Sequence, residues 1–151
     1  MIWKPNVTVA AVLEQDGRFL LVEENTPDGV RFNQPAGHLE KGEALIDAAV
    51  REALEETAYH FKPTALIGVY RWPHPTRDIT YLRFAFTGEI LGHEPDRALD
   101  DGIIRAAWLT PEEILANEQA GKNRSPLIRR CVEDCLAGRR YPLDLLTDYP
   151  G

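Results

Sequence analysis

The first third of the chain alternates short apolar runs with clusters of turn-forming residues. Runs rich in β-branched and apolar residues predict strands at Asn6–Leu13, Arg18–Glu24 and Val30–Gln34. The segment Gln15-Asp16-Gly17 lies between the first two runs and is typical of a tight hairpin turn. The breaker-rich segment Asn25–Gly29 predicts a second turn before the third strand. The pattern therefore indicates a β-rich beginning with closely spaced strands.

The second half of the chain has longer strand patterns followed by helix patterns. Strands are predicted at Ala65–Trp72, Ile79–Ile90 and Ile103–Leu109. Helices are predicted to begin at Thr110, where proline and a capping-box glutamate follow the threonine, and at Ser125-Pro126. A mixed sheet with helices on both faces is the simplest arrangement of these elements.

Glycines mark the expected ends of the last two helices. The first helix should end near Gly121 and the second at Gly138, after which residues 139–151 are predicted to be extended or loop-like. Neither an internal repeat nor a linker is visible, so we expect residues 1–151 to form a single domain of the α/β class.

The segment Ala44–Glu56 combines helical periodicity with an acidic stripe. Its predicted packing face consists of Ile46, Val50, Ala53 and Leu54. Glu52, Glu55 and Glu56 fall within an arc of about 100°, because positions three and four apart share a helix face. These like charges repel, and a hard divalent cation such as Mg²⁺ takes oxygen ligands of this kind. The alternative is a solvated acidic face on which Arg51 and Glu55 form an ordinary pair.

Composition narrows the class of partner. The chain has 151 residues, 44% of them hydrophobic, and a formal net charge of −7. This acidic balance argues against duplex nucleic acid or an anionic membrane as the main partner, because both require a basic surface. No apolar run approaches the length of a membrane span, and we expect a cytoplasmic protein. Cys131 and Cys135 are interpreted as ordinary core or surface thiols.

The loop and acidic helix over about residues 37–59 resemble the signature of the Nudix hydrolases, G-x5-E-x7-R-E-U-x-E-E-x-G-U, in which U is a bulky apolar residue. The fixed positions that match are Gly37, Glu43, Arg51, Glu52, Glu55 and Glu56. The sequence departs from the signature at Ala53, Ala58 and Tyr59, close to the expected helix exit. The resemblance implies an α/β/α sandwich with a central mixed β-sheet.

The resemblance also implies a reaction, in which water attacks phosphorus in a substituted diphosphate while divalent metal neutralises the phosphate oxygens. Glu52, Glu55 and Glu56 would be ligands of Mg²⁺, with Mn²⁺ as an alternative. The carbonyl group of Ala36 or Gly37 would complete the site. In the same reading, Arg51 orients the carboxylates, and Glu43 supports the geometry of the loop and helix.

The general base is left open by the sequence. Glu52 is one candidate, because many members of the family use the acid at that position of the signature. Others use a carboxylate in a later loop, for which Asp100 and Asp101 are the candidates here. The alternative for both aspartates is a turn-forming role beside Gly102.

Substrate contacts are expected from aromatic and basic residues near the signature. Tyr70 and Trp72 could stack on a flat ring, and Arg83 could meet phosphate. Gly37 and His38 adjoin the loop and could also touch the substrate. The alternatives are core aromatic residues and a neutral structural histidine. Weaker candidates are Arg18, Asn33, Gln34, His74 and Arg77.

Further segments resemble a bacterial Nudix subgroup described as phosphatases. They are Phe32–Glu40, Tyr81–Phe84, Arg124–Leu127 and Gly138–Leu143. This resemblance implies release of orthophosphate from small molecules, namely nucleoside di- and triphosphates or hydroxymethylpyrimidine pyrophosphate. One alternative is a pyrophosphatase for ADP-ribose or dinucleoside polyphosphates, and another is a noncatalytic nucleotide sensor. Both monomer and homodimer are compatible with the sequence.

Overall fold

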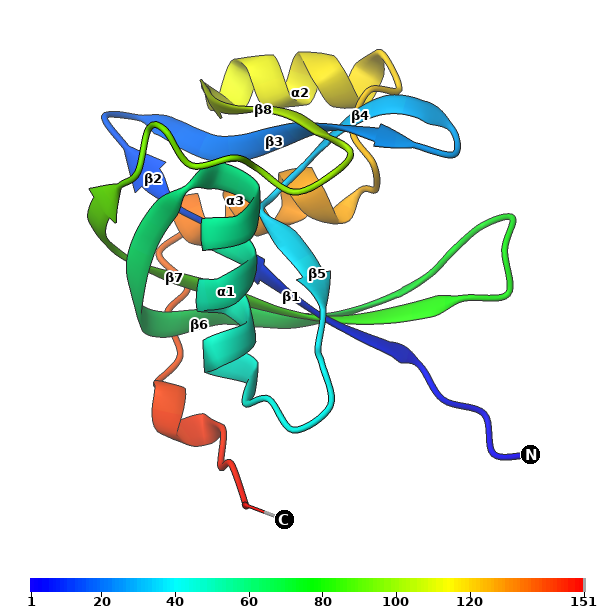
Figure 1. Cartoon of the computed structure of the whole chain (residues 1–151). Coiled ribbons are helices and arrows are strands. Elements are labelled where there is room, and N and C mark those ends of the chain that lie inside the picture. The colour runs from blue at the N-terminus through cyan, green and yellow to red at the C-terminus, as the bar shows by residue number, and fades with distance from the viewer. Residues whose placement is uncertain (151) are drawn as a thin grey trace.

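The fold is organised around a four-stranded mixed sheet. The computed structural model describes residues 1–150 (Figure 1). The strands of this sheet are β1 (Asn6–Ala11), β5 (Ala36–His38), β6 (Tyr59–Pro73) and β7 (Thr80–His93), in the order β5-β1-β7-β6. β1 runs parallel to β7, whereas β5 and β6 are antiparallel to their neighbours. The predicted α/β class and central mixed sheet are therefore confirmed.

A second, antiparallel sheet was not expected from the sequence. It contains β2 (Glu14–Gln15), β3 (Arg18–Thr26), β4 (Gly29–Asn33) and β8 (Ile103–Leu109). β3 pairs with each of the other three strands. The predicted hairpin turn is confirmed, since Asp16 and Gly17 have φ angles of 52° and 78°, as a type I′ turn requires. The strand patterns were thus correct, but their division between two sheets depends on long-range pairing.

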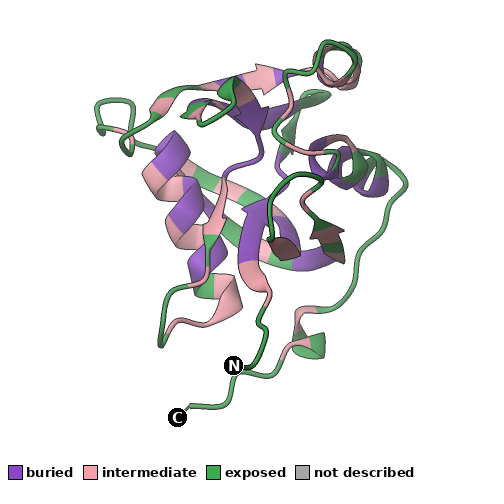
Figure 2. Ribbon diagram, turned by 90° about the vertical axis from the view of Figure 1, so that its right-hand side faces the viewer, coloured by how far each residue is buried: buried purple, intermediate pink, exposed green. Residues whose placement is uncertain are grey.

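The helices cover opposite faces of the strand layer (Figure 1). They are α1 (Leu45–Thr57), α2 (Pro111–Gln119) and α3 (Leu127–Leu136), followed by a short 3₁₀ turn, η1 (Leu143–Leu145). Odd and even positions of β1 separate two cores: Val9 packs with α1, and Ala10 packs with α2 and α3. Figure 2 shows buried positions where the helices face the strands. The result is the expected α/β/α layering.

Helix α1 packs largely through the face that the sequence predicts. Ala53 is fully buried, and Ile46 and Val50 are partly buried and pack against the same core, whereas Leu54 lies outside that core and stays partly accessible. The helix also buries Ala48 and Ala49, which the predicted face did not include. Small residues allow a helix to approach a sheet closely, and Glu52 and Glu56 of the same helix are buried as well.

The end of α1 tolerates the missing signature glycine. Ala58 has a φ angle of 62°, and its N–H donates to the Leu54 carbonyl oxygen at 2.9 Å. This is the left-handed helix end that glycine usually provides, and alanine adopts it at a cost of about 1 kcal/mol. The departure at position 58 therefore leaves the helix exit intact.

Helix α2 begins as the sequence predicts. The Thr110 hydroxyl accepts from the Glu113 N–H at 3.2 Å, and the Glu113 carboxylate accepts from the Thr110 N–H at 3.0 Å. In the tail, which the sequence predicts to be extended or loop-like, Leu143–Leu145 form a short 3₁₀ turn. Leu143 and Leu146 pack against the core on the α1 side, which favours that compact turn. Across residues 1–150, every helix is too short or too polar to cross a bilayer.

Candidate active site

Strand β5 brings the first signature residue onto the acidic helix. Gly37 lies within this short strand, opposite Val9 of β1, and not in the loop that the sequence suggested. A Cβ atom at position 37 would overlap the Glu52 carboxylate. The glycine therefore lets the Glu52 carboxylate lie against the backbone of β5, and a side chain at position 37 would displace that carboxylate.

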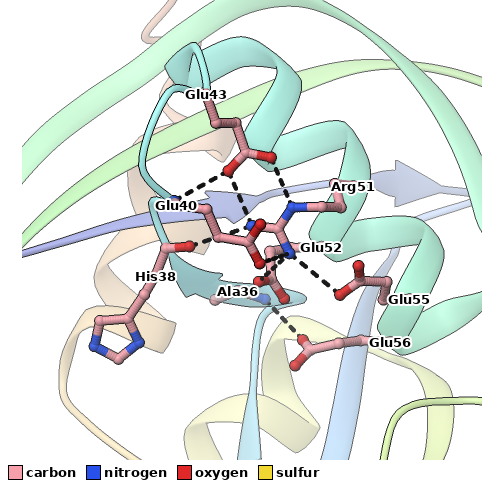
Figure 3. Close-up of polar contacts among 8 residues, drawn as sticks. All are labelled: Ala36, His38, Glu40, Glu43, Arg51, Glu52, Glu55 and Glu56. Carbon is pink, nitrogen blue, oxygen red and sulfur yellow. Dashed lines mark hydrogen bonds and ion pairs between the residues drawn. The ribbon is translucent and has the colours of Figure 1, made fainter.

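Arg51 is the centre of the polar network in this region (Figure 3). Its Nε donates to Glu43 Oε2 at 2.7 Å, and its Nη2 donates to Glu43 Oε1 at 3.0 Å. Its Nη1 donates to Glu52 at 2.9 Å and to Glu55 at 3.2 Å. The hydrogen bond from Arg51 holds the pKa of Glu43 below its usual value. Arg51 thus contacts Glu43, Glu52 and Glu55 together, and the expected roles of Arg51 in orienting the carboxylates and of Glu43 in supporting the loop and helix geometry stay predictions.

Glu56 lies deepest of the three helix carboxylates. Its Oε1 accepts from the Ala36 N–H at 2.9 Å, which ties the helix to β5. Burial raises the pKa of Glu56 to about 9, although the Ala36 hydrogen bond opposes the shift. The negative charges of Glu24, Glu52 and Asp100 raise it further. A carboxylate in this environment favours either a proton or a bound cation.

The pKa values of Glu52 and Glu55 are also raised, although less than that of Glu56. Burial raises the pKa of Glu52, and the hydrogen bond from Arg51 opposes that change. The pKa of Glu55 is also raised, by burial first and then by the negative charge of Asp100. Because these negative charges lie close together, a bound divalent cation would stabilise the ionised carboxylates.

Asp100 is the loop carboxylate that the fold brings to the helix. Its N–H donates to the Glu55 carbonyl oxygen at 3.0 Å, and its side chain lies beside the Glu55 carboxylate. Asp101 is exposed in the turn that leads to β8. The structure thus separates two candidates that the sequence could not distinguish, and it places Asp100 closer to the acidic stripe.

The chemistry of the donor set fits a hard divalent metal, although the ligands are not preassembled. Among residues 1–150, no group of three or more His, Cys, Asp or Glu side chains has metal-binding geometry. The reason is visible in Figure 3, where Arg51 engages Glu52 and Glu55 while Ala36 engages Glu56. Carboxylate oxygens are the ligands that Mg²⁺ prefers, and small side-chain rotations would free them.

A cavity of about 410 Å³ opens beside these carboxylates. Its polar lining combines acids, histidines and arginines: Asp28, Glu40, Glu52, Glu56, His38, His74, Arg77, Arg83 and Arg124. Trp72 and Tyr81 form a stacked pair in its wall, with ring centroids 5.9 Å apart and planes 16° apart. A cavity that is lined by the signature acids and by stacked aromatic rings suits a ligand with a phosphate and a flat ring.

The predicted substrate contacts divide into two groups. Gly37, His38, Trp72 and Arg83 line the cavity, and the His38 ring points away from the Arg51 network (Figure 3). Tyr70 does not line it. The Tyr70 hydroxyl donates to Asp134 at 2.7 Å, and the ring lies under α3 beside a separate hollow.

Two residues of the site, Glu24 and Arg124, were given no role by the sequence, and Asn33 was only a weaker candidate for a substrate contact. Glu24 is buried and forms an ion pair with Arg124, and Asn33 hydrogen-bonds to Arg83 at 2.9 Å. Glu24 could have been noticed as a charge at the end of an apolar strand run. Arg124 stands in a segment quoted only for resemblance, and nothing in its local sequence indicates that it reaches the cavity.

Comparison with known proteins identifies the class. Residues 3–131 match the NUDIX domain family, and the chain belongs to the Nudix family of hydrolases. Nudix hydrolases generally use divalent metal ions and act on small, nucleotide-like molecules. The resemblance seen in the signature and the prediction of a phosphohydrolase are therefore confirmed.

Individual relatives narrow the comparison. The chain is 40% identical over 148 residues to Phosphatase NudJ of Escherichia coli K12, covering 98% of this chain and 94% of that protein. It is 52% identical to a solved NUDIX hydrolase from Nitrosomonas europaea, with a TM-score of 0.93 and coverage of 98% and 99%. A MutT NUDIX hydrolase from Burkholderia pseudomallei shares the fold at 19% identity, with a TM-score of 0.70 and coverage of 87% and 98%.

Proposed function

We propose that the protein is a Mg²⁺-dependent phosphohydrolase that releases orthophosphate from nucleoside di- or triphosphates or from hydroxymethylpyrimidine pyrophosphate. The observation that carries this proposal is one cavity lined by Glu52, Glu56 and the stacked pair of Trp72 and Tyr81. The similarity to a relative named a phosphatase supports orthophosphate as the product.

The metal would be held by Glu52, Glu55 and Glu56, with the Ala36 carbonyl as a further ligand. A bound divalent ion supplies Lewis acidity toward the phosphate oxygens and lowers the pKa of a coordinated water. Mg²⁺ is proposed first because the donors are all oxygen, and Mn²⁺ would accept the same set.

The remaining signature residues position these ligands. Arg51 holds Glu52 and Glu55 within reach of one another, and Glu43 fixes Arg51 through two hydrogen bonds. A proton from the attacking water needs a carboxylate acceptor. Glu52 and Asp100 are the acceptors favoured by placement, and Asp101 is the weaker alternative because Asp100 is the aspartate that contacts Glu55.

Substrate recognition is assigned to the cavity wall. Trp72 would stack on the ring of the substrate, and Gly37 and His38 would lie beside the phosphate that reacts. Arg83 offers a buried cation to phosphate. Tyr70 is given no part in recognition, because its hydroxyl is bound to Asp134 and the residue does not line the cavity.

A substrate panel with product identification tests this function. Purified protein, stripped of metal and then supplied with Mg²⁺, is incubated with nucleoside di- and triphosphates, hydroxymethylpyrimidine pyrophosphate, ADP-ribose and a dinucleoside polyphosphate. Chromatography should show orthophosphate from members of the first two groups and none without metal. AMP from ADP-ribose or the dinucleotide would favour the pyrophosphatase alternative, and binding without turnover on every compound would favour a sensor.

A matched pair of variants controls for contamination. Glu52→Gln removes a carboxylate of the cavity, whereas Glu112→Gln removes an exposed carboxylate on α2. Activity that belongs to this site should be lost in the first variant and kept in the second.

A further inference from the structure

Arg83 is a buried cation whose partners are all neutral. The residue is only 5% exposed. Its Nη1 donates to Gln34 Oε1 at 2.7 Å and reaches the Cys131 thiol at 3.9 Å, and its Nη2 donates to Asn33 Oδ1 at 2.9 Å. Within residues 1–150, Arg83 forms no ion pair with a carboxylate. Burying a charge without a counter-charge is costly, so this arrangement favours the arrival of an anion.

The guanidinium group of Arg83 fixes the orientation of the Asn33 and Gln34 side-chain amides. A guanidinium group only donates, so the oxygen atom of each amide must face it. The other end of Gln34 is also used, because its Nε2 donates to the Ile128 carbonyl oxygen at 2.8 Å. Asn33 differs, since its Nδ2 has no hydrogen-bond partner among the described residues and Asn33 lines the cavity. The cavity wall therefore presents free donors from both Arg83 and Asn33.

Arg124 adds a second cation to the same wall. Its backbone N–H donates to the Phe32 carbonyl oxygen at 2.8 Å, which places it beside the end of β4 and next to Asn33. Its side chain pairs with Glu24 and also lines the cavity. Glu24 thus positions Arg124, leaving further guanidinium N–H groups free to donate.

The sheet register shows where this wall lies relative to the signature carboxylates. Ala36, which binds Glu56, is opposite Ala10, and Arg83 is opposite Thr8 two residues along β1. Tyr81 is a further two residues along β7. Each step of two residues is about 7 Å along a strand. Arg83 therefore stands between the metal-binding acids and the aromatic pair.

We propose that Arg83, Asn33 and Arg124 form an anion subsite that binds a phosphate group of the substrate without help from a metal. The assignment to substrate phosphate rests on the proposed function. The subsite lies between the acids and the aromatic rings, so it suits a second phosphate located between the reacting phosphate and the ring. Donors without acceptors select phosphate oxygens over neutral polar groups. Compounds with a single phosphate should then be poor substrates.

A purely structural role for the network is the competing explanation. Arg83 connects β4, β7 and α3 through its contacts, and these contacts could stabilise the fold without any role in anion binding. Asn33→Asp separates the two roles. The aspartate keeps an oxygen acceptor for Arg83 and supplies a counter-charge, but it removes the Nδ2 donor and neutralises the subsite.

The experiment measures binding of inorganic pyrophosphate by titration calorimetry to the full chain, stripped of metal on a chelating resin so that no anionic chelator competes. The wild type should bind one pyrophosphate in a saturable manner. Asn33→Asp should bind at least about tenfold more weakly while its unfolding midpoint is equal or higher. Arg83→Gln should show a similar loss. Arg71→Gln, which removes an exposed arginine from the other face of the neighbouring β6, should bind as the wild type does.

Absence of pyrophosphate binding to the stripped wild type would overturn the subsite, as would unchanged binding by Asn33→Asp. If Arg83→Gln does not fold, Arg83→Lys replaces it, since lysine keeps the charge but loses the planar fork and should weaken binding. Because the titration contains no metal, pyrophosphate is bound without being hydrolysed, and failure of this binding is distinct from failure of the proposed hydrolysis.

Discussion

The signature region and the cavity wall are built in opposite ways. In the signature region, Arg51 reaches acids that lie one, four and eight positions away in the sequence. In the cavity wall, Arg83 contacts Asn33 and Gln34, which are 50 and 49 positions away. Gln34 in turn contacts Ile128, 94 positions away. The network proposed to hold the metal is formed by residues close in sequence, whereas the surface proposed to recognise the substrate exists only after the two sheets and α3 have packed together.

This difference has a consequence for how each region responds to mutation. A local network on one helix can lose a charged member and keep its backbone, because the helix is stabilised by its alanine surface on the sheet. A long-range network that joins β4, β7 and α3 couples recognition to packing. Variants in the signature region should therefore change turnover, and variants in the cavity wall should change affinity.

The largest effect is expected from Glu56→Gln. Loss of a metal ligand should lower kcat with Mg²⁺ by about 10²- to 10⁴-fold, since metal stabilisation of the transition state is worth several kcal/mol. Steady-state kinetics of orthophosphate release would measure the change, with Glu112→Gln as the control. Near-normal turnover of Glu56→Gln would show that Glu56 does not hold the catalytic metal.

The same residue predicts a pH dependence of stability in the metal-free protein. The pKa of Glu56 is about 9 in the folded state, above the ordinary value of 4.5, because the carboxyl group is buried. The folded protein therefore binds this proton more tightly than the unfolded chain does. The resulting stabilisation is complete below pH 4.5 and is lost as the pH rises through about 9.

Urea unfolding of metal-free protein between pH 5 and about 9 would measure this loss, which should amount to a few kcal/mol. Glu56→Gln cannot ionise at this position, so its stability should fall less with pH than that of the wild type. Parallel stability curves for the two proteins would contradict the burial of a protonated Glu56. Saturating Mg²⁺ should reduce the loss in the wild type, because the cation stabilises the ionised form.

Arg51→Lys should have a smaller effect on turnover than loss of a ligand. Lysine keeps the positive charge but cannot bind Glu43, Glu52 and Glu55 simultaneously through a planar fork. Residues that orient metal ligands typically contribute about 10- to 100-fold to activity or metal affinity. Metal titration and kcat should both change by that amount, while KM for the substrate stays close to the wild-type value. A change confined to KM would assign Arg51 to substrate binding.

The contrast between local and long-range construction also explains what the sequence could predict. The Asp16-Gly17 hairpin turn, the Thr110 capping box and the signature acids depend on nearby residues, and each was recognisable, whereas the two-residue strand β2 was not predicted. The start of β6 was missed because Lys62 and Pro63 interrupt its apolar pattern, and pairing with β7 through bulges forms that part of the strand. No local sequence pattern predicts such pairing between strands.

The sequence could not distinguish Asp100 from Asp101 either, because the distinguishing contact joins segments that are distant in the sequence. Adjacent aspartates beside a glycine have equivalent local patterns, and only the contact of the Asp100 backbone with Glu55 distinguishes them. Tyr70 and Trp72 face the same side of β6 in the sequence pattern, yet α3 covers Tyr70 and leaves Trp72 beside the cavity. Packing of a distant helix thus decided which aromatic residue reaches the cavity.

The smallest expected effect tests that last distinction. Trp72→Ala removes one ring of the stacked pair and should raise KM by about tenfold, because stacking of a base on an aromatic side chain is worth about 1–3 kcal/mol. Tyr70→Phe should leave KM unchanged, since the lost hydroxyl contacts Asp134 and not the cavity. Trp3→Ala, which removes an exposed tryptophan near the N-terminus, controls for nonspecific loss of an indole ring.

Kinetics with one ring-bearing diphosphate and with inorganic pyrophosphate would separate stacking from other effects of Trp72→Ala. The loss should appear with the first compound and not with the second, which has no ring to stack. Equal losses on both compounds would mean that Trp72 supports the cavity instead of contacting the ring. A rise in KM for Tyr70→Phe that matches Trp72→Ala would place recognition on the α3 side, in the separate hollow that Tyr70 and Asp134 line.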